Sequence, residues 1–376
     1  MQPRERLMAT LRGDPVDRPA VCFYEINGLD ERPEVDDPYN IYTHPSWKPL
    51  IQLAREKSDR IVMRSVPFPE AIDPLEELTR RTRWYVDGSR FERREIHLGG
   101  RTLVDVTRRD PDVNTVWRVE HLFKDSADVE AFLDLPEPPD PGAPDISGVL
   151  ETEKMLGESG IVMIDTADPL CIAAGLFAMA DYTILASTEP RLFHRLLQRF
   201  ALDIHRRTAA VAHALPGRLW RIYGPEYASP PYLHPRLFQE YVVNYDKPMV
   251  KAIHASHGYA RIHSHGRLRL ILAAIAATGC AGLDPIEPPP QGDMHLAEVR
   301  EQVGGQMVLF GNLEASDLEN LPAADFREKV RTALAEGVGG RGFVLMPSAC
   351  PYGRVLTRQA LRNYEVMVEE VERMLG

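Results

Sequence analysis

The sequence has few cysteines, no long apolar runs and no excess of positive charge. Its four cysteines have no paired spacing, which argues against a disulfide framework and favours a reduced, cytoplasmic setting. No apolar run approaches the roughly 20 residues that cross a bilayer. The first residues, MQPRERLMATLRGD, lack the apolar segment of a secretory signal, so no membrane association is expected.

The balance of charge excludes another class of partner. Asp and Glu outnumber Lys and Arg by 55 to 44, which gives a formal charge of −11. A chain without an overall positive field is a poor ligand for nucleic acid, because phosphate binding depends on lysine and arginine. We therefore expect a small-molecule substrate and no nucleic-acid partner.

Several diagnostic motifs are also missing. No G-x-G-x-x-G turn follows the first strand candidate, which argues against a dinucleotide-binding sheet. No G-x-S-x-G elbow surrounds Ser264, and no oxyanion hole can be identified for Cys350, so neither residue is expected to be a lone nucleophile. No low-complexity tract or internal repeat interrupts the chain.

Short β-branched runs alternate with longer helical patterns along most of the sequence. Eight runs are predicted as strands, each followed by a helix, and eight such units favour a (β/α)₈ TIM barrel over a doubly wound sheet. The longest helical patterns span 189–214 and 235–256, and the last spans 357–375. The predicted strands are 20–26, 60–66, 160–165, 218–223, 258–263, 282–286, 306–310 and 342–346.

One region breaks this rhythm. Residues 84–121 alternate between polar and apolar side chains, and Asp87-Gly88 and Gly99-Gly100 have the composition of hairpin turns. The proline-rich segment 135–141 then closes the region, since so many prolines fit neither a helix nor a central strand. We predict one domain over residues 1–376, in which 84–135 form an insertion of β-hairpins and a short helix.

Polar residues follow the predicted strands at the edge where a barrel presents its chemistry. His263 and His265 are separated by one residue, so an extended segment would point both to the same side. Glu287 follows the next strand and Cys350 follows the last. Two imidazoles, a thiolate and a carboxylate form a tetrahedral donor set that suits Zn²⁺.

Two other interpretations of these residues stay open. Histidines at strand ends often bond only to backbone or solvent, and an isolated cysteine is often a small buried side chain. A pair of acids for glycoside hydrolysis, Glu226 with Glu287 or Glu314, is available as in many barrels.

Stretches through nearly the whole chain resemble the uroporphyrinogen decarboxylase superfamily, whose fold is a (β/α)₈ barrel. The similarity lies in PRERLMATLRGDPVDRPAV at 3–21, in GGRTLVDVTRRDPDVNTVWRVEHLFKDSADVEAFLDLP at 99–136, in HSHGRLRLILAAIAATGCAGLDPIEPP at 263–289, in GGQMVLFGNLEASDL at 304–318 and in SACPYGRVLTRQALRNYEVMVEEV at 348–371. True uroporphyrinogen decarboxylases carry an R-Q-A-G-R signature after the first strand and a G-H-G near the last. This chain instead has Phe23-Tyr24-Glu25-Ile26-Asn27-Gly28, without arginine, and Ser348-Ala349-Cys350.

The chain is more similar to the zinc-dependent branch of the superfamily, whose members exchange methyl groups with corrinoid proteins. That branch has H-x-C after the fifth strand and a cysteine after the last. His263 and Cys350 match this pattern, while His265 stands where the branch has a cysteine. More distant cobalamin-independent methionine synthases add a glutamate ligand at an interval similar to that of Glu287.

The resemblance implies a methyltransferase that moves a methyl group between a corrinoid protein and a thiol or tetrahydrofolate. Zinc is expected at His263, His265, Cys350 and Glu287. Two alternatives remain: a metal-free carboxy-lyase with His263 or His265 as proton donor, and a non-enzymatic corrinoid- or ligand-binding module. Apolar helical faces are compatible with a homodimer. For the remaining roles we expect contacts to cofactor from Asp165 and Glu25, and to substrate from Glu226, Tyr223 and Asn312.

Overall fold

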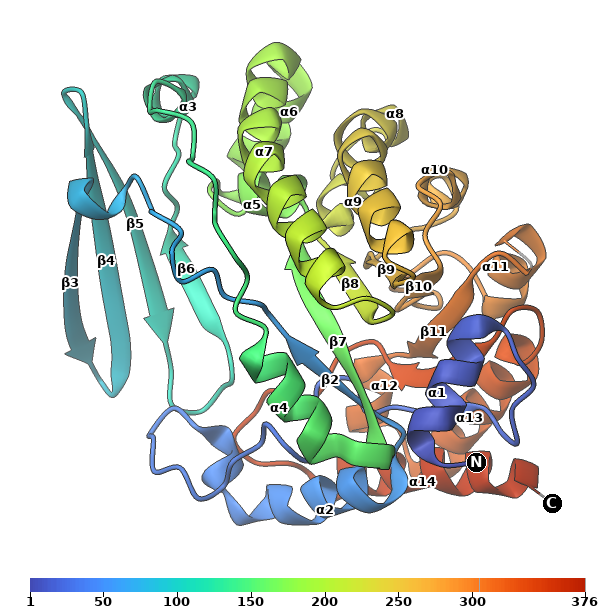
Figure 1. Cartoon of the computed structure of the whole chain (residues 1–376). Coiled ribbons are helices and arrows are strands. Elements are labelled where there is room, and N and C mark those ends of the chain that lie inside the picture. Colours follow the sequence, from blue (N-terminus) through green and yellow to red (C-terminus); the bar gives the residue numbers. More distant parts are fainter. Residues whose placement is uncertain (304, 376) are drawn as a thin grey trace.

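The computed structural model describes residues 1–303 and 305–375; Gly304 and Gly376, the other two positions of the predicted domain, lie outside the described residues. The chain forms an α/β fold with a curled sheet of eight parallel strands, and a second sheet of four antiparallel strands stands beside it (Figure 1). Within the described residues, no helix combines the length and apolarity needed to cross a membrane.

The eight parallel strands are those of the predicted barrel. They pair in the order β1-β12-β11-β10-β9-β8-β7-β2. No ladder joins β1 to β2 in the described part of the chain, but the backbone N–H of Asp59 donates to the carbonyl of Val21 at 2.7 Å, so these two strands adjoin. The strands are β1 Ala20–Val21, β2 Arg60–Arg64, β7 Gly160–Ala167, β8 Leu219–Tyr223, β9 Tyr259–His263, β10 Gly282–Asp284, β11 Val308–Leu313 and β12 Phe343–Pro347.

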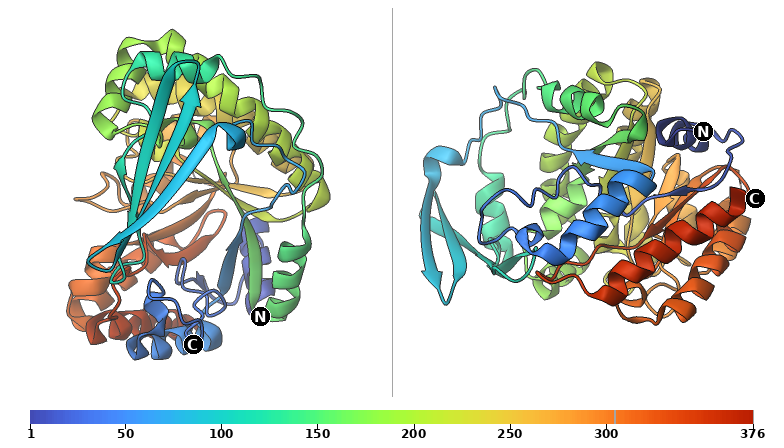
Figure 2. Two further views of the ribbon diagram at one scale, coloured as in Figure 1. Left: turned by 90° about the vertical axis from the view of Figure 1, so that its left-hand side faces the viewer. Right: turned by 90° about the horizontal axis from the view of Figure 1, so that it is seen from below.

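Helices lie along the outer side of this curled sheet (Figures 1 and 2). The longest, α7, and the carboxyl-terminal α14 match the predicted helices at 189–214 and 357–375, and 235–256 forms α8, a π-helical turn at Gln239–Val243 and α9. The helices are α1 Pro3–Arg12, α2 Lys48–Lys57, α3 Ser126–Leu133, α4 Ser147–Leu156, α5 Pro169–Ala174, α6 Met179–Thr188, α7 Pro190–Ala214, α8 Pro235–Phe238, α9 Asn244–Ala255, α10 Leu272–Ala277, α11 Leu296–Val303, α12 Ala315–Asn320, α13 Ala323–Gly337 and α14 Arg358–Glu372.

The buried apolar side chains form two clusters, one on each face of the curled sheet. Successive side chains of a strand point to opposite faces. On β7, Ile161 and Met163 join a small cluster inside the curl, whereas Val162 and Ile164 join the large cluster between sheet and helices. Leu7 of α1 also joins the inner cluster, so α1 covers the amino-terminal end of the strands. The inner cluster fills that end with apolar side chains, and polar groups occupy the other.

The antiparallel sheet confirms the predicted hairpins. Its strands are β3 Thr79–Val86, β4 Ser89–Leu98, β5 Arg101–Arg109 and β6 Val116–Glu120. Asp87-Gly88 and Gly99-Gly100 connect the first three strands, and all four turn residues have positive φ, as a two-residue hairpin requires. The sheet starts five residues earlier than the predicted position 84, and it stands apart from the curled sheet when the molecule is seen from below (Figure 2).

Three predicted strands are too long. The second, expected to span 60–66, ends at Arg64. The other two end where the chain turns out of the sheet. The first was expected to span 20–26 but ends at Val21, because Tyr24 has a φ of +57° and turns the chain out of the sheet. The sixth was expected to span 282–286 but ends at Asp284, since Pro285 has no N–H for a ladder and Ile286 also has a φ of +57°. Both departures occur where a strand leads into the candidate site.

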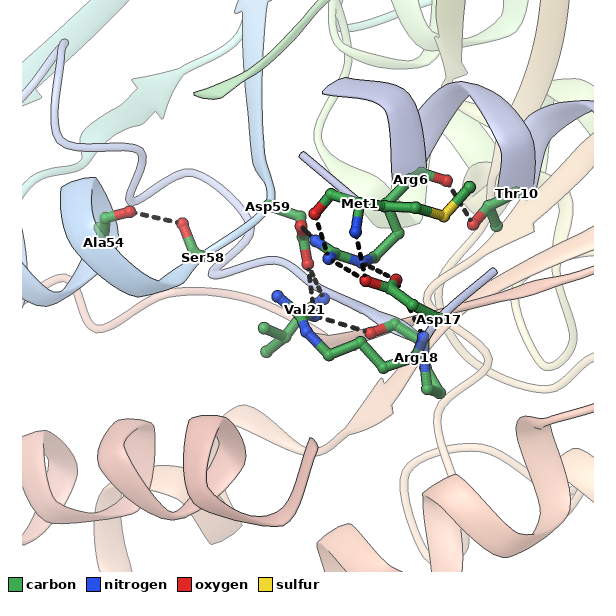
Figure 3. A network of polar contacts seen from close by, with 10 residues as sticks. Met1, Arg6, Thr10, Asp17, Arg18, Val21, Ala54, Ser58 and Asp59 are labelled. Atoms are coloured by element: carbon green, nitrogen blue, oxygen red, sulfur yellow. Dashed lines mark hydrogen bonds and ion pairs between the residues drawn. The ribbon is translucent and has the colours of Figure 1, made fainter. Parts of the chain in front are cut away.

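A polar network joins α1 to the amino-terminal ends of β1 and β2 (Figure 3). The fully buried carboxylate of Asp59 accepts hydrogen bonds from Nη1 of Arg6 at 2.5 Å and from Nη1 of Arg18 and the backbone N–H of Val21 at 2.8 Å. Nε and Nη2 of Arg6 also bond to Asp17. The network therefore connects the helix that covers this end of the sheet to its two terminal strands.

Candidate active site

A cavity of about 370 Å³ opens at the carboxyl ends of the parallel strands. Its lining combines ionisable and aromatic side chains from β8, β9 and the loops after β1, β8, β9 and β12 with residues of the antiparallel insertion. The cavity has the size of a small-molecule site. The lining residues are Tyr24, Glu25, Asn114, Thr115, Arg221, Tyr223, Glu226, His263, His265, Ser348, Ala349, Cys350 and Tyr352.

His263 is held by a buried carboxylate on the neighbouring strand. Its Nδ1 lies 2.7 Å from Oδ2 of Asp284, which is in register with it on β10, and Oδ1 of Asp284 lies 2.8 Å from Nε of Arg261. Burial raises the pKa of Asp284, but Arg261 and His263 overcome this effect and hold it below its usual range. Asp284 is therefore an anion that fixes the orientation of the His263 ring.

His265 has an equivalent partner. Its Nδ1 lies 2.7 Å from Oε1 of Glu287, whose Oε2 accepts the backbone N–H of Gly266 at 2.7 Å. Burial alone would lower the pKa of His265 and raise that of Glu287, yet their mutual hydrogen bond shifts both the opposite way. The two imidazole rings are 4.7 Å apart and nearly perpendicular, and neither Nε2 has a hydrogen-bond partner in residues 1–303 and 305–375.

Cys350 follows β12, the strand that pairs with β1. Its half-buried thiol donates to Oε2 of Glu25 at 3.3 Å, which brings the loop after the last strand against the loop after the first. Burial and the negative charge of Glu25 raise the pKa of the Cys350 thiol well above its usual range. The side chain is therefore a thiol rather than a thiolate at neutral pH.

Arg221 brings a positive charge to the cavity, but each of its three side-chain nitrogens already forms a hydrogen bond. Nε and Nη2 bond to the two oxygens of Asp165 at 2.6 and 3.1 Å, and Nη1 bonds to the hydroxyl of Tyr24. Burial raises the pKa of Tyr24, so its phenol keeps its proton. Beyond β8, Oε2 of Glu226 accepts the backbone N–H of Gly224 at 3.0 Å, and this carboxylate forms no ion pair among the described residues.

The antiparallel insertion provides one wall of the cavity. Asn114 and Thr115, which precede β6, line it. The backbone N–H of Asn114 donates to the carbonyl of Tyr352 at 2.7 Å, and that of Arg354 donates to the carbonyl of Asp112 at 2.7 Å. These bonds attach the insertion to the loop that carries Cys350.

The structure brings together six of the nine predicted site residues: Glu25, Tyr223, Glu226, His263, His265 and Cys350 all line the cavity. The other three lie elsewhere. Glu287 contacts His265 from behind, Asp165 is paired with Arg221, and Asn312 lines a separate cavity of about 270 Å³. Within residues 1–303 and 305–375, no three His, Cys, Asp or Glu side chains are already grouped as a metal site requires.

Seven of the lining residues were not among the predicted site residues: Tyr24, Asn114, Thr115, Arg221, Ser348, Ala349 and Tyr352. Arg221 could have been predicted from the sequence, because it is two positions before Tyr223 on the same strand and therefore points to the same face. Tyr352 is two residues after Cys350. No local pattern indicated Asn114 and Thr115, since their place depends on how the insertion packs against the loop after β12.

Comparisons with solved structures agree with the fold. A methyltransferase from Methanosarcina mazei aligns over 100% of both chains with a TM-score of 0.65 and 17% sequence identity, a similarity that concerns the fold alone. Two D-psicose 3-epimerases also match: one in the presence of D-fructose, over 61% of this chain and 91% of that one (TM-score 0.31, 9% identity), and one from Clostridium cellulolyticum H10 with D-tagatose, over 60% and 82% (0.35, 10%). With such low scores the epimerases carry no argument.

No curated protein matches the chain. The sequence profile of the uroporphyrinogen decarboxylase (URO-D) family, in contrast, matches residues 119–374, from the last strand of the insertion to the carboxyl-terminal helix. The matched range covers more than half of the chain and includes both histidines, Glu287 and Cys350. The chain therefore belongs to the uroporphyrinogen decarboxylase (URO-D) family.

Proposed function

We propose that the protein is a methyltransferase that moves a methyl group between a corrinoid carried by a partner protein and a thiol or tetrahydrofolate acceptor, with zinc at the cavity. The observation that carries this proposal is the donor set of one cavity: two imidazoles, each held through Nδ1 by a carboxylate, and a thiol. A histidine that ligates a metal usually donates its other ring N–H to a carboxylate or carbonyl.

The types of donor in the cavity suit zinc, and the contacts of Glu287 change the ligand set that we propose. Nε2 of His263, Nε2 of His265 and Sγ of Cys350 are the proposed ligands. Glu287 fits the role of an orienting partner, because both of its oxygens already accept hydrogen bonds. Zn²⁺ bound there would supply a Lewis acid that lowers the pKa of an acceptor thiol.

The chain's own groups have defined tasks in this proposal. Asp284 and Glu287 bond to Nδ1 of the two rings, so each imidazole in its neutral form would carry its lone pair on Nε2, and Arg261 holds Asp284 in place. Oε2 of Glu25 already accepts the Cys350 S–H, so it is positioned to take up that proton when the thiolate forms. Glu226 and Tyr223 are the proposed contacts to substrate, and we also propose a single domain whose eight strands close into a (β/α)₈ barrel.

A metal-free carboxy-lyase is the second candidate. The raised pKa of His265, which its bond to Glu287 produces against the effect of burial, makes an imidazolium available as a proton donor. Against it, Arg221, the one Lys or Arg among the described lining residues, is already paired with Asp165. A substrate with several carboxylates would therefore lack counter-charges.

Metal content and methyl transfer separate the two candidates. Elemental analysis should find close to one zinc per chain in the wild type, and loss of zinc in His263→Ala and Cys350→Ala. His213→Ala, at an exposed position of α7, is the matched control and should keep its zinc. The zinc protein should demethylate free methylcobalamin in the presence of a thiol. A folded, metal-free wild type that transfers no methyl group would refute the proposal.

A further inference from the structure

The two faces of the antiparallel sheet have different surroundings. Ile96 and Leu98 of β4 and Leu103 of β5 pack into the large apolar cluster, so these side chains mark the face that meets the rest of the chain. Their neighbours along each strand point the other way. The sheet lies in front of the curled sheet when the molecule is seen from that side, so its other face points away from the curled sheet (Figure 2).

This other face, the outer face, carries a row of large side chains across all four strands. The water-exposed face of an antiparallel sheet is commonly polar. Here the register aligns two tryptophans, a phenylalanine and an arginine, and Trp117 at the edge keeps 43% of its surface exposed. The row consists of Trp84, Phe91, Arg108 and Trp117, and the outer face also includes Arg80, Thr82, Val86, Ser89, Arg93, Glu95, Val104, Val106 and Glu120.

The charges of the outer face are nearly balanced within the chain. Arg93 lies 2.8 Å from Glu95, and Arg108 lies 3.2 Å from Asp110. Binding of a polyanion such as nucleic acid depends on several lysines or arginines that are free to meet phosphates. The outer face therefore favours an apolar partner of low net charge.

The row of large side chains is complementary to itself. A two-fold axis parallel to the strands, midway between β4 and β5, places β3 of one copy over β6 of a second copy, and β4 over β5. Trp84 then faces Trp117, and Phe91 faces Arg108, at both ends of the row. Stacked aromatic rings and a guanidinium over a ring are both favourable contacts.

The same axis supplies a partner that one arginine lacks. Arg80 of β3 forms no ion pair within residues 1–303 and 305–375 of its own chain. Glu120 of β6 is in the row of Thr82, two residues from Arg80. Since β3 of one copy lies over β6 of the other, these opposite charges come side by side twice in the pair of molecules.

We propose that two copies of this chain form a dimer in which the outer faces of their antiparallel sheets pack against each other. Aligned sheets pack in this way about 10 Å apart, with their strands within about 30°. Four strands about 4.8 Å apart and about 30 Å long give a flat footprint of roughly 550 Å². Side chains raise its accessible area towards the roughly 800 Å² per partner of a standard interface. The interface is thus a sheet, and not the helical faces that the sequence suggested.

Sedimentation measurements test both the dimer and the face. The wild type should sediment as a dimer at micromolar concentration. Trp117→Glu should raise the Kd of the dimer at least about 100-fold, because its carboxylate would lose water against the facing ring of Trp84. Tyr85→Glu is the matched control and should leave the Kd unchanged, since Tyr85 is an exposed aromatic residue of β3 that points to the opposite face of the same sheet.

A charge exchange tests the position of the two-fold axis, and it also serves if circular dichroism shows that Trp117→Glu does not fold. Arg80→Glu and Glu120→Arg should each weaken the dimer about tenfold, because each places like charges side by side twice. The variant with both substitutions should recover most of the wild-type affinity, since the two opposite charges then meet again in exchanged positions.

Three results would overturn the inference, which does not depend on the proposed function. They are a monomeric wild type, a dimer that a folded Trp117→Glu variant keeps unchanged, and a doubly exchanged variant that is no tighter than the single ones. A monomer that binds a single-stranded oligonucleotide, and loses this binding in Trp117→Glu, would assign the outer face to nucleic acid instead.

Discussion

Replacement of Glu287 by glutamine tests whether this residue orients a metal ligand or binds the metal itself. Its two carboxylate oxygens accept from Nδ1 of His265 and from the backbone N–H of Gly266, each at 2.7 Å. A glutamine of the same size has one oxygen and one NH₂ group, so it can accept only one of these bonds. If the oxygen stays with Gly266, the NH₂ group faces Nδ1 and forces the His265 proton onto Nε2.

The expected loss of zinc affinity follows from the lost hydrogen bond between Glu287 and His265. A hydrogen bond to a charged group contributes about 1.5–3 kcal/mol, and a protonated Nε2 cannot ligate a metal. Loss of such a partner weakens metal binding by roughly 10–100-fold, which agrees with this energy at about 1.4 kcal/mol per tenfold change. We therefore expect Glu287→Gln to raise the Kd for zinc by this factor while the protein stays folded.

The assay is competition for zinc with a chromophoric chelator, with circular dichroism as a check on folding. Glu298→Gln is a matched control, because Glu298 lies on α11 away from the cavity and pairs with Arg269 at the surface. An unchanged Kd for Glu287→Gln would refute the orienting role. X-ray absorption of the wild type that shows a glutamate oxygen bound to zinc would instead restore Glu287 as a direct ligand.

Three further predictions concern stability and pH. Asp59→Asn removes a fully buried carboxylate from its ion pair with Arg6, and should lower the free energy of unfolding by about 3 kcal/mol and depress Tm. Gly224→Ala should destabilise the protein by about 2–4 kcal/mol, because Gly224 has a φ of +126° and a Cβ there would lie 2.1 Å from Oδ1 of Asp168; circular dichroism melts would measure it, and a normal Tm would refute the steric argument. Hydrogen bonds from Arg6 lower the pKa of Asp17, so their stabilisation is complete above about pH 4 and is lost as the pH falls through the lowered pKa. The Tm difference between wild type and Asp17→Asn should therefore shrink in acid, and a difference that is independent of pH would contradict this assignment.

The elements that local chemistry determines were predictable from the sequence. Alternation and the Asp87-Gly88 and Gly99-Gly100 turns located the antiparallel hairpins, since such turns favour positive φ whatever surrounds them. The eight parallel strands were located for a similar reason, because each is a short apolar run between helical patterns. Their ends were less certain: local propensity extends the first strand to residue 26, but the chain turns away at Tyr24 to carry Glu25 into the cavity.

Positions that depend on packing between distant segments were not predictable. Asn312 was expected just after a strand, yet it lies within β11 and lines a different cavity, because the strand runs three residues beyond its predicted end. Asn114 and Thr115 reach the cavity through backbone bonds between the insertion and the loop after β12. No periodicity within 38 residues of alternating sequence could indicate that contact.

The spacing of His263 and His265 predicted that the two rings lie on the same side, but not which carboxylates hold them. Period-two geometry places both rings on one side, as the structure has them, 4.7 Å apart. The carboxylates that orient the two rings come from the next strand and the loop after it. Asp284 is in register with His263, and Glu287, three residues later, contacts His265. Adjacent parallel strands end at the same edge, so a search for an acid behind each histidine would have found both partners. Both oxygens of Glu287 are occupied by hydrogen bonds, which is why we propose that it supports His265 and is not itself a ligand.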